Sequence, residues 1–271
     1  MTAISNRRGE VACVAAVGFM ALLFLAQAAL PGLFAGMGRG TFMVVGCLTK
    51  LVLEGLGALL AHRAAGGFDP GTHVRRAWRL LSLGLLGFFL AQLALSRYQI
   101  ARGVQSPFPS LADVFFVAAY PLLIAALVSF VKAYQEAGFP MGSASERWTL
   151  MGLVLALCLG LGYPMLAPVA GTAAPPLEKL LNLAYPLLDL ALLVPTAFLL
   201  RVTLRLQGGN VQRVWVALLV GVLALAGGDI AFAYFSTLDM ARLEPVVDAL
   251  FIASYGSFAW GSLAQRNLLS R

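Results

Sequence analysis

The sequence predicts an all-α, polytopic membrane protein. Of the 271 residues, 60% are apolar and 11% are charged, whereas a soluble domain carries about 25% charged residues. The mean hydropathy is +0.86. So few charged side chains cannot cover a water-soluble globule, and the surplus of apolar side chains must face lipid. A cytosolic enzyme, a secreted disulfide scaffold and a disordered chain are therefore excluded.

Eight apolar runs are long enough to cross a bilayer, because a transmembrane helix needs about 20 mainly apolar residues. Short connectors with polar, glycine or proline residues separate the runs, and no segment remains for a soluble domain. We therefore expect a single integral membrane domain over residues 1–271. Its eight transmembrane helices are predicted near 11–30, 41–61, 77–97, 111–132, 148–168, 180–200, 214–236 and 246–264.

The basic residues predict the orientation. The net charge of +7 comes from arginines and lysines scattered at the ends of the apolar runs, which is a topology signal and not a nucleic-acid-binding patch. Thirteen of them fall on one side and five on the other, which places both termini in the cytoplasm. An alternative for the first run is a signal peptide, because Arg7 and Arg8 precede it and Ala26-Gln27-Ala28 resembles a cleavage site. Cleavage would leave the remaining topology unchanged.

Three apolar runs open with an acid that is followed seven residues later by a tyrosine. The pairs are Asp113–Tyr120, Glu178–Tyr185 and Asp248–Tyr255, and the acids are 65 and 70 residues apart. Seven residues are nearly two helical turns, so acid and tyrosine share one stripe of the helix. The alternative to a functional role is that the acid caps its helix and the tyrosine makes a hydrogen bond between helices.

The run before each of these helices opens with an arginine one or two residues before a tryptophan, at Trp78, Trp148 and Trp215. Gly84 and Gly221 each follow a tryptophan by six residues. We therefore predict three parallel two-helix repeats, made of the third and fourth, fifth and sixth, and seventh and eighth spans. The tryptophans are interpreted as an interfacial belt at the level of the lipid headgroups.

Polar and ionisable residues within the apolar runs predict a ligand pocket, because such groups are costly in a membrane. Since the spans alternate in direction, most of them fall toward the outer half, and the predicted pocket opens to the outside. Lys50 is the expected counter-ion of Asp189, Asp229 or Glu54. The alternative is that these residues form packing pairs only. The candidate ligand-pocket residues are Lys50, Glu54, Gln92, Asp113, Tyr120, Tyr185, Asp189, Asp229, Asp248 and Tyr255.

No metal, cofactor or catalytic site is predicted. His62 and His73 lie in a loop, and no histidine, cysteine and carboxylate cluster has the spacing of a metal site. The sequence contains no GxSxG, HExxH or P-loop motif. Cys13, Cys47 and Cys158 lie within apolar runs, and we interpret them as small apolar side chains.

The stretch from Pro109 to Leu123, which reads Pro-Ser-Leu-Ala-Asp and ends Tyr-Pro-Leu-Leu, resembles a known sensory region. Similar multi-span membrane regions precede GGDEF and EAL domains in bacterial diguanylate cyclases and phosphodiesterases, and also some histidine kinases. A second stretch, Tyr185-Pro-Leu-Leu-Asp189, and the surroundings of Asp229 extend the resemblance over the third to eighth spans. The resemblance implies a sensory module of the bacterial inner (cytoplasmic) membrane.

No output domain follows Arg271 in this sequence, so we expect either the sensory part of a longer chain or a free-standing subunit. The leading hypothesis is a sensory module that binds a small ligand in the outward-facing pocket. Binding would shift the last helix and act on a cytoplasmic effector or a partner membrane subunit, and homodimer formation stays open. The alternatives are a lysoplasmalogenase-like membrane enzyme or carrier for a lipid or small amphiphile, and a scaffold subunit of a membrane complex.

Overall fold

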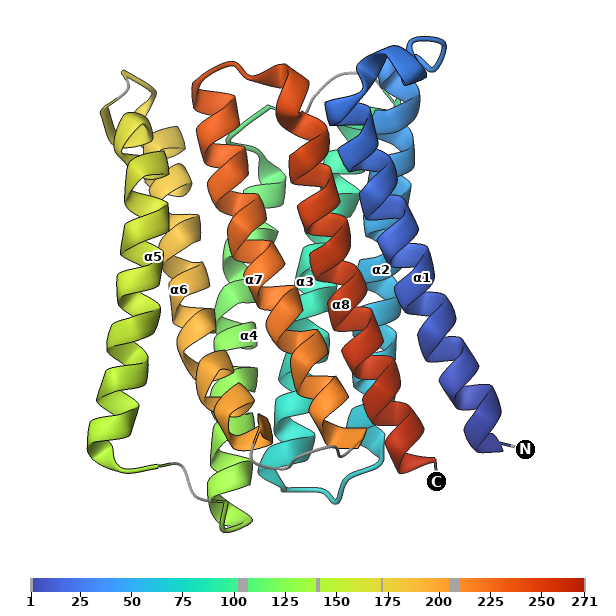
Figure 1. Ribbon diagram of the computed structural model, residues 1–271, viewed down its shortest axis with the longest axis vertical. Helices are drawn as coiled ribbons and strands as arrows, with labels where there is room; N and C mark the ends of the chain where they lie inside the picture. The colour runs from blue at the N-terminus through green and yellow to red at the C-terminus, as the bar shows by residue number, and fades with distance from the viewer. Residues whose placement is uncertain (1, 102–106, 140–141, 172, 205–209, 271) are drawn as a thin grey trace.

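The computed structural model shows a bundle of long, nearly aligned helices (Figure 1). It describes residues 2–101, 107–139, 142–171, 173–204 and 210–270, and of these it gives the backbone alone for 2–6, 39, 157, 158, 161, 165, 203, 204 and 210. Within these ranges all regular structure is helical, as predicted. The helices are α1 (Thr2–Ala29), η1 (Pro31–Phe34), α2 (Arg39–Gly66), α3 (His73–Ala101), α4 (Leu111–Glu136), α5 (Ala144–Gly171), α6 (Pro176–Leu204), α7 (Asn210–Thr237), η2 (Ala241–Leu243) and α8 (Glu244–Leu269).

Seven of the described helices, α1 to α4 and α6 to α8, are long and apolar enough to cross a membrane. The chain is therefore a multi-pass membrane protein. The predicted span at 148–168 lies within α5, a 28-residue helix that is not among these seven. Helices of 26 to 29 residues extend over about 40 Å at 1.5 Å per residue, so each helix is longer than its predicted span, at one end or at both.

Two helices begin with the same capping arrangement, in which a serine and an acid three residues later satisfy each other's backbone amides. At the start of α4, Asp113 accepts from the Ser110 amide at 2.6 Å, and the Ser110 hydroxyl accepts from the backbone of the first turn. At α5, Glu146 accepts from the Ser143 amide at 2.7 Å, and the Glu146 amide donates to the Ser143 hydroxyl at 3.2 Å. The acid of the repeated motif thus caps α4, as the simpler alternative predicts.

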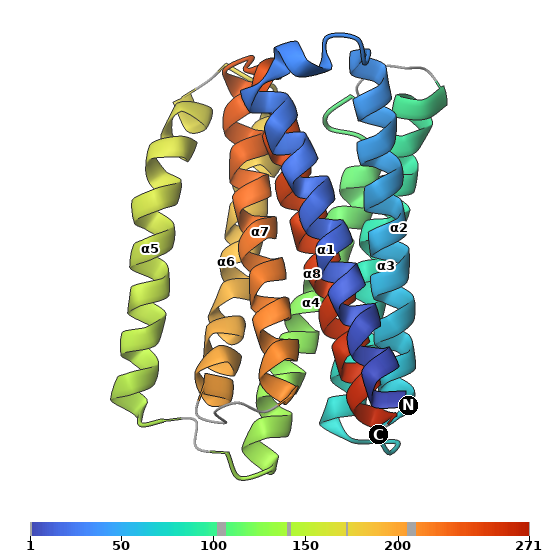
Figure 2. The same cartoon turned by 45° about the vertical axis from the view of Figure 1, so that its right-hand side comes forward.

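Six of the helices form a closed ring in the order α2, α3, α4, α6, α7, α8. Outside the ring, α1 packs on α8, and α5 packs on α6 and α7. Figure 1 shows α1 and α5 on opposite sides of the bundle, and in Figure 2 α1 runs across the front of α8. Both termini lie at one end of the bundle, which we call the terminal end. The opposite end is called the cavity end.

Helix α1 is fastened to the ring near both of its ends. Near its start, the buried Glu10 accepts from Arg213 of α7 at 3.2 Å and from Asn267 of α8 at 2.9 Å. Near the cavity end, Phe24 is 1% exposed and its ring packs edge-on against Phe42 of α2. The first apolar run is therefore an integral packing element of the described fold.

Aromatic rings fill the bundle near the terminal end, where α3, α4 and α7 meet. The Phe130 ring lies edge-on between Trp78, at 5.2 Å, and Trp215, at 4.9 Å. The Trp215 indole N–H donates to the Tyr134 hydroxyl. The predicted interfacial belt is therefore wrong for Trp78 and Trp215, which are buried between helices, while Trp148 is exposed. Packing on Phe130 buries more apolar area of these two rings than a position among the lipid headgroups would.

Two hairpins use a glycine at the same relative position. Gly84 of α3 faces Leu123 of α4, and Gly221 of α7 faces Phe258 of α8. Each glycine lies six residues after a tryptophan, and each partner lies three residues after the tyrosine of the shared motif. A Cβ atom at Gly84 would lie 2.4 Å from the Leu123 side chain, so glycine is what allows the two helices to approach this closely.

Candidate functional site

A cavity of about 1020 Å³ opens at the cavity end and extends into the ring. Its rim is formed by the connectors between α1 and α2, α3 and α4, and α7 and α8. Its wall comes from α1, α2, α3, α4, α7 and α8, and Tyr185 of α6 contributes at its base. This volume is at the upper end of the range for small-molecule sites, which is about 300–1,000 Å³.

Most of the predicted pocket residues line this cavity. They are Lys50, Gln92, Asp113, Tyr120, Tyr185, Asp229, Asp248 and Tyr255. The remaining two, Glu54 and Asp189, are not in its wall, and both are almost completely buried behind it. The structure therefore brings the ten residues together around one space, with two of them one layer deeper.

The tyrosines of the three repeated motifs converge at the base of the cavity. Phe88 of α3 lies between two of them, with ring centroids 5.8 Å from Tyr120 and 5.9 Å from Tyr255. The Tyr120 and Tyr185 rings are 6.2 Å apart. Because α4, α6 and α8 run in the same direction around the ring, one motif position on each helix arrives at the same depth.

The Tyr120 hydroxyl joins two aspartates from different helices. Its Oη lies 2.8 Å from Asp189 Oδ1 on α6 and 2.7 Å from Asp229 Oδ2 on α7. A hydroxyl has one proton to donate, so the second contact requires that one carboxyl group donates a proton to Oη. The two carboxyl groups therefore hold at least one proton between them. This arrangement stores a proton in the buried base of the cavity.

Asp113 has two structural roles at once. One of its oxygens caps α4 through Ser110, and the other accepts from the Tyr185 hydroxyl at 2.7 Å. The groups that contact this carboxylate are all donors, since the Ser110 hydroxyl also lies 3.3 Å from it. The carboxyl group of Asp113 thus connects α4 to α6 at the cavity wall.

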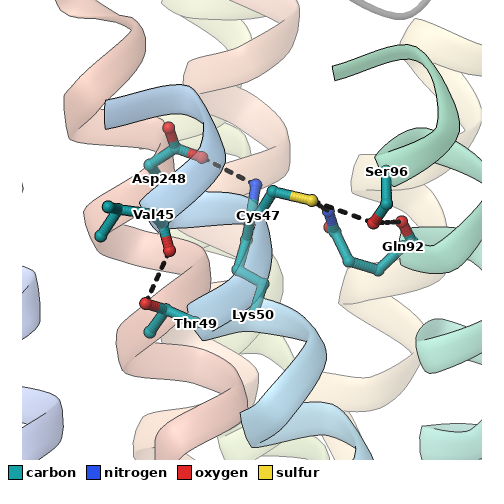
Figure 3. A network of polar contacts seen from close by, with 7 residues as sticks. All are labelled: Val45, Cys47, Thr49, Lys50, Gln92, Ser96 and Asp248. Atoms are coloured by element: carbon teal, nitrogen blue, oxygen red, sulfur yellow. Dashed lines mark hydrogen bonds and ion pairs between the residues drawn. The ribbon is translucent and has the colours of Figure 1, made fainter. Parts of the chain in front are cut away.

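Lys50 forms an ion pair with Asp248, with Nζ and Oδ1 2.7 Å apart (Figure 3). The expected counter-ions Asp189, Asp229 and Glu54 were therefore wrong as its direct partner. The reason is geometric: α2 packs against α8, which carries Asp248, whereas Asp189 and Asp229 lie on helices that do not adjoin α2 in the ring. The side chains are 8% and 27% exposed, so the pair forms part of the cavity wall.

Cys47 belongs to a polar network between α2 and α3, seen on the right of Figure 3. The Ser96 hydroxyl donates to the Gln92 carbonyl oxygen at 2.7 Å, so the Cys47 thiol supplies the proton for its 2.9 Å contact with Ser96. The Gln92 amide donates to the sulfur at 3.6 Å. Interpreting Cys47 as an apolar side chain was therefore wrong. Cys13 is half-buried, and the side chain of Cys158 lies outside the described residues.

Glu54 is fully buried, and neither of its carboxyl oxygens has a hydrogen-bond partner among the described residues. Its electrostatic neighbours are Lys50, one helical turn away, and Tyr255. An uncompensated carboxyl group in this position is costly. It is the least satisfied ionisable group around the cavity.

The sequence did not single out the residues at the mouth of the cavity. These include the acids Asp239 and Glu244, the basic Arg242, and the amides Gln27 and Gln99. All of them lie at helix ends or in connectors, where polar residues are ordinary in a membrane protein. The usable signal was the aromatic content of these same segments, for example Phe34 and Phe108.

Among the described residues, no group of three or more histidine, cysteine and carboxylate side chains is arranged to hold a metal ion. Comparisons with protein families, curated proteins and solved structures found no match to this chain. The functional argument therefore rests on the cavity and on the residues that line it.

Proposed function

We propose that this protein is a sensory module of a bacterial inner membrane, which binds a small ligand in the cavity and transmits binding to a cytoplasmic effector. The supporting observation is that α8 lines the cavity at one end of the bundle and makes a polar contact at the other. Asp248, Phe251 and Tyr255 of α8 line the cavity, and Asn267 of the same helix bonds to Glu10 at the terminal end. A ligand that shifts the first part of α8 therefore has a continuous helix through which to act.

The proposed topology has eight transmembrane helices, with α5 as the fifth, and both termini in the cytoplasm. In support, the basic side chains described at helix ends gather at the terminal end, for example on Arg63, Arg75, Arg76 and Arg266, and few lie at the cavity end. The positive-inside rule places the basic end in the cytoplasm. The cavity then opens to the outside of the cell.

The proposed ancestry is a two-helix unit repeated three times, as α3–α4, α5–α6 and α7–α8. The shared depth of the motif tyrosines and the equivalent glycine contacts of the first and third hairpins support it. The proposed partner is a cytoplasmic output domain or a separate subunit of the GGDEF, EAL or histidine-kinase type, in line with the resemblance of the 109–123 stretch.

A fusion tests this role. A diguanylate cyclase domain is attached after Arg271, and cyclic di-GMP is measured in cells that carry the fusion. Lys50→Met removes the ion pair between α2 and α8, so it is expected to change cyclic di-GMP by about fivefold or more, the scale of a typical coupling free energy. The matched control is Lys132→Met, which makes the same substitution at an exposed position on α4 near the terminal end.

The control fusion is expected to keep the output of the unmodified fusion. Equal cyclic di-GMP in the Lys50→Met and Lys132→Met fusions, at equal amounts of membrane-inserted protein, would contradict the sensory role. Asp248→Asn provides a second cavity variant, because it removes the same ion pair from the α8 side.

One observation favours a second candidate function, a membrane enzyme that acts on a lipid or small amphiphile. Two carboxyl groups that share a proton, as Asp189 and Asp229 do around Tyr120, are suited to general acid and base chemistry. Turnover of a lysolipid by the purified protein, lost in Asp229→Asn, would support this candidate. Absence of turnover at any pH between 5 and 9 would remove it.

A further inference from the structure

Among the described residues that line the cavity, acids outnumber basic residues. The Lys50–Asp248 ion pair contributes no net charge. Two further carboxyl groups line the cavity, Asp113, which receives hydrogen bonds only, and Asp229 at the base. At the mouth, Asp239 and Glu244 outnumber Arg242. A bound molecule that compensates this excess carries positive charge.

The wall of the cavity is aromatic to an unusual degree. Phenylalanine and tyrosine make up 12 of the 35 lining residues, against 10% aromatic residues in the whole chain. Ring faces attract cations, and of all cations an ammonium ion on an apolar body uses both the charge and the hydrophobic area of such a wall. A metal ion or an inorganic cation would leave most of this wall unused.

The unsatisfied polar atoms around the cavity are acceptors. Gln27 and Gln99 line the mouth, and each has a buried amide oxygen with no hydrogen-bond partner among the described residues. Acceptors are complemented by N–H donors, which an ammonium group supplies and a carboxylate or phosphate does not.

We propose that the cavity binds a small organic ammonium ion with an aromatic or aliphatic body. The ammonium group lies toward Asp229 at the base and Asp113 in the wall, and the apolar body lies against the phenylalanines of the wall. This assignment deepens the sensory role proposed above and rests on it for its biological meaning, but the binding itself does not depend on signalling.

Three probes with one phenyl body test the charge. They are 2-phenylethylammonium, neutral 2-phenylethanol and anionic 3-phenylpropionate, titrated into the full chain in nanodiscs of zwitterionic lipid, with lipid-only nanodiscs as the blank. The ammonium probe is expected to bind about tenfold or more tightly than the alcohol, as a charge-assisted hydrogen bond provides. The carboxylate is expected to bind least. Equal binding of cation and alcohol, or no binding of the cation, overturns the proposal.

Variants locate the binding charge. The proposal assigns one negative charge to the Asp189–Asp229 pair. Asp229→Asn alone then leaves that charge on Asp189, so the affinity for the ammonium probe should change by less than about threefold. Asp189→Asn together with Asp229→Asn removes that charge and should weaken binding about tenfold. Arg242→Gln, at an exposed position of the mouth, should strengthen it about twofold, because a like charge is removed. This variant stays informative if the double variant does not fold, and unchanged affinity in every variant overturns the proposal.

The two proposals fail separately. If 2-phenylethylammonium binds as expected but Lys50→Met does not alter the output of the fusion, the ligand class stands and the sensory role falls. If the cavity variants alter the output but the three probes are not discriminated by charge, the sensory role stands and the ligand class falls.

Discussion

At the terminal end, Trp78, Phe130 and Trp215 fill the space between three helices with edge-on rings, whereas at the cavity end aromatic rings line an open space of about 1020 Å³. The difference lies in the polar groups between the rings. Beside Phe130, the Trp215 indole N–H donates to the Tyr134 hydroxyl and no carboxyl group joins the described helices there. Around Phe88, tyrosine hydroxyls and carboxyl groups connect α4, α6 and α7.

This contrast separates a closely packed end of the bundle from an open one. Rings that pack on each other exclude other molecules and fix the separation of their helices. Rings held apart by hydrogen-bonded pairs leave room for a ligand, and the ligand can compete for the same polar groups. Both regions share the helices α3, α4, α7 and α8. A shift of one of these helices at the cavity end would therefore displace it at the terminal end as well.

The same substitution at the two ends should have different effects. Phe130→Ala leaves a void in the ring cluster and is expected to lower the free energy of unfolding by about 3–5 kcal/mol. Phe251→Ala removes a half-buried ring that lines the cavity, so it should cost about 1–2 kcal/mol. Equilibrium unfolding of both variants in mixed micelles measures the difference. Equal losses would mean that the cavity end is packed as tightly as the terminal end.

The ion pair of the cavity wall should show strong coupling between its partners. Lys50→Met and Asp248→Asn each leave a buried charge without its partner, so each should destabilise the fold. The double variant should recover part of the loss, with a coupling free energy of about 1–3 kcal/mol in a double-mutant cycle. Additive losses in the cycle would show that the 2.7 Å contact contributes nothing to the wall.

The hydroxyl groups at the base should differ in importance. Tyr120→Phe removes the group that joins Asp189 to Asp229 and is expected to cost about 1–2 kcal/mol of unfolding free energy. Tyr185→Phe removes one donor from Asp113, which keeps its contacts with Ser110, so the loss should be about 1 kcal/mol or less. The same unfolding measurement ranks the two variants. A larger loss for Tyr185→Phe than for Tyr120→Phe would contradict the greater importance of the Tyr120 hydroxyl.

The smallest effect is expected outside the ring, at the start of α5. The Ser143 amide, followed by Arg201, holds the pKa of the Glu146 carboxyl group below its ordinary value of 4.5. A lowered folded-state pKa stabilises the fold above the unfolded-state pKa, and the stabilisation is lost as the pH falls through the folded-state value. Because Glu146 is exposed, Glu146→Gln should change stability at pH 7 very little. A large loss at pH 7 would contradict this.

The helical class and the positions of the helices were predictable because long apolar runs allow few other structures in a membrane. The gathering of the motif tyrosines was predictable in part, since helices of one direction carry one motif position to one depth. The partner of Lys50 was not predictable. It depends on which helices adjoin in the ring and on how far each is rotated, and no local pattern fixes either.

The same limit explains the tryptophans and Cys47. A tryptophan near an arginine at a helix start is as typical of a membrane interface as of a protein core. Trp78 and Trp215 lie in the core because Phe130, on another helix, packs against both rings. Cys47 lies in an apolar run, yet its helix turns it toward Ser96 and Gln92. Long-range packing decided both cases.

The central claim is that the cavity end is open to the outside of the cell and the terminal end is closed. Substituted-cysteine labelling in intact cells tests it most directly, with the native cysteines replaced. Phe251→Cys should react with a membrane-impermeant thiol reagent added from outside, and Phe130→Cys should not react from either side of the membrane. Labelling of Phe251→Cys from the cytoplasmic side alone, or ready labelling of Phe130→Cys, would contradict the account.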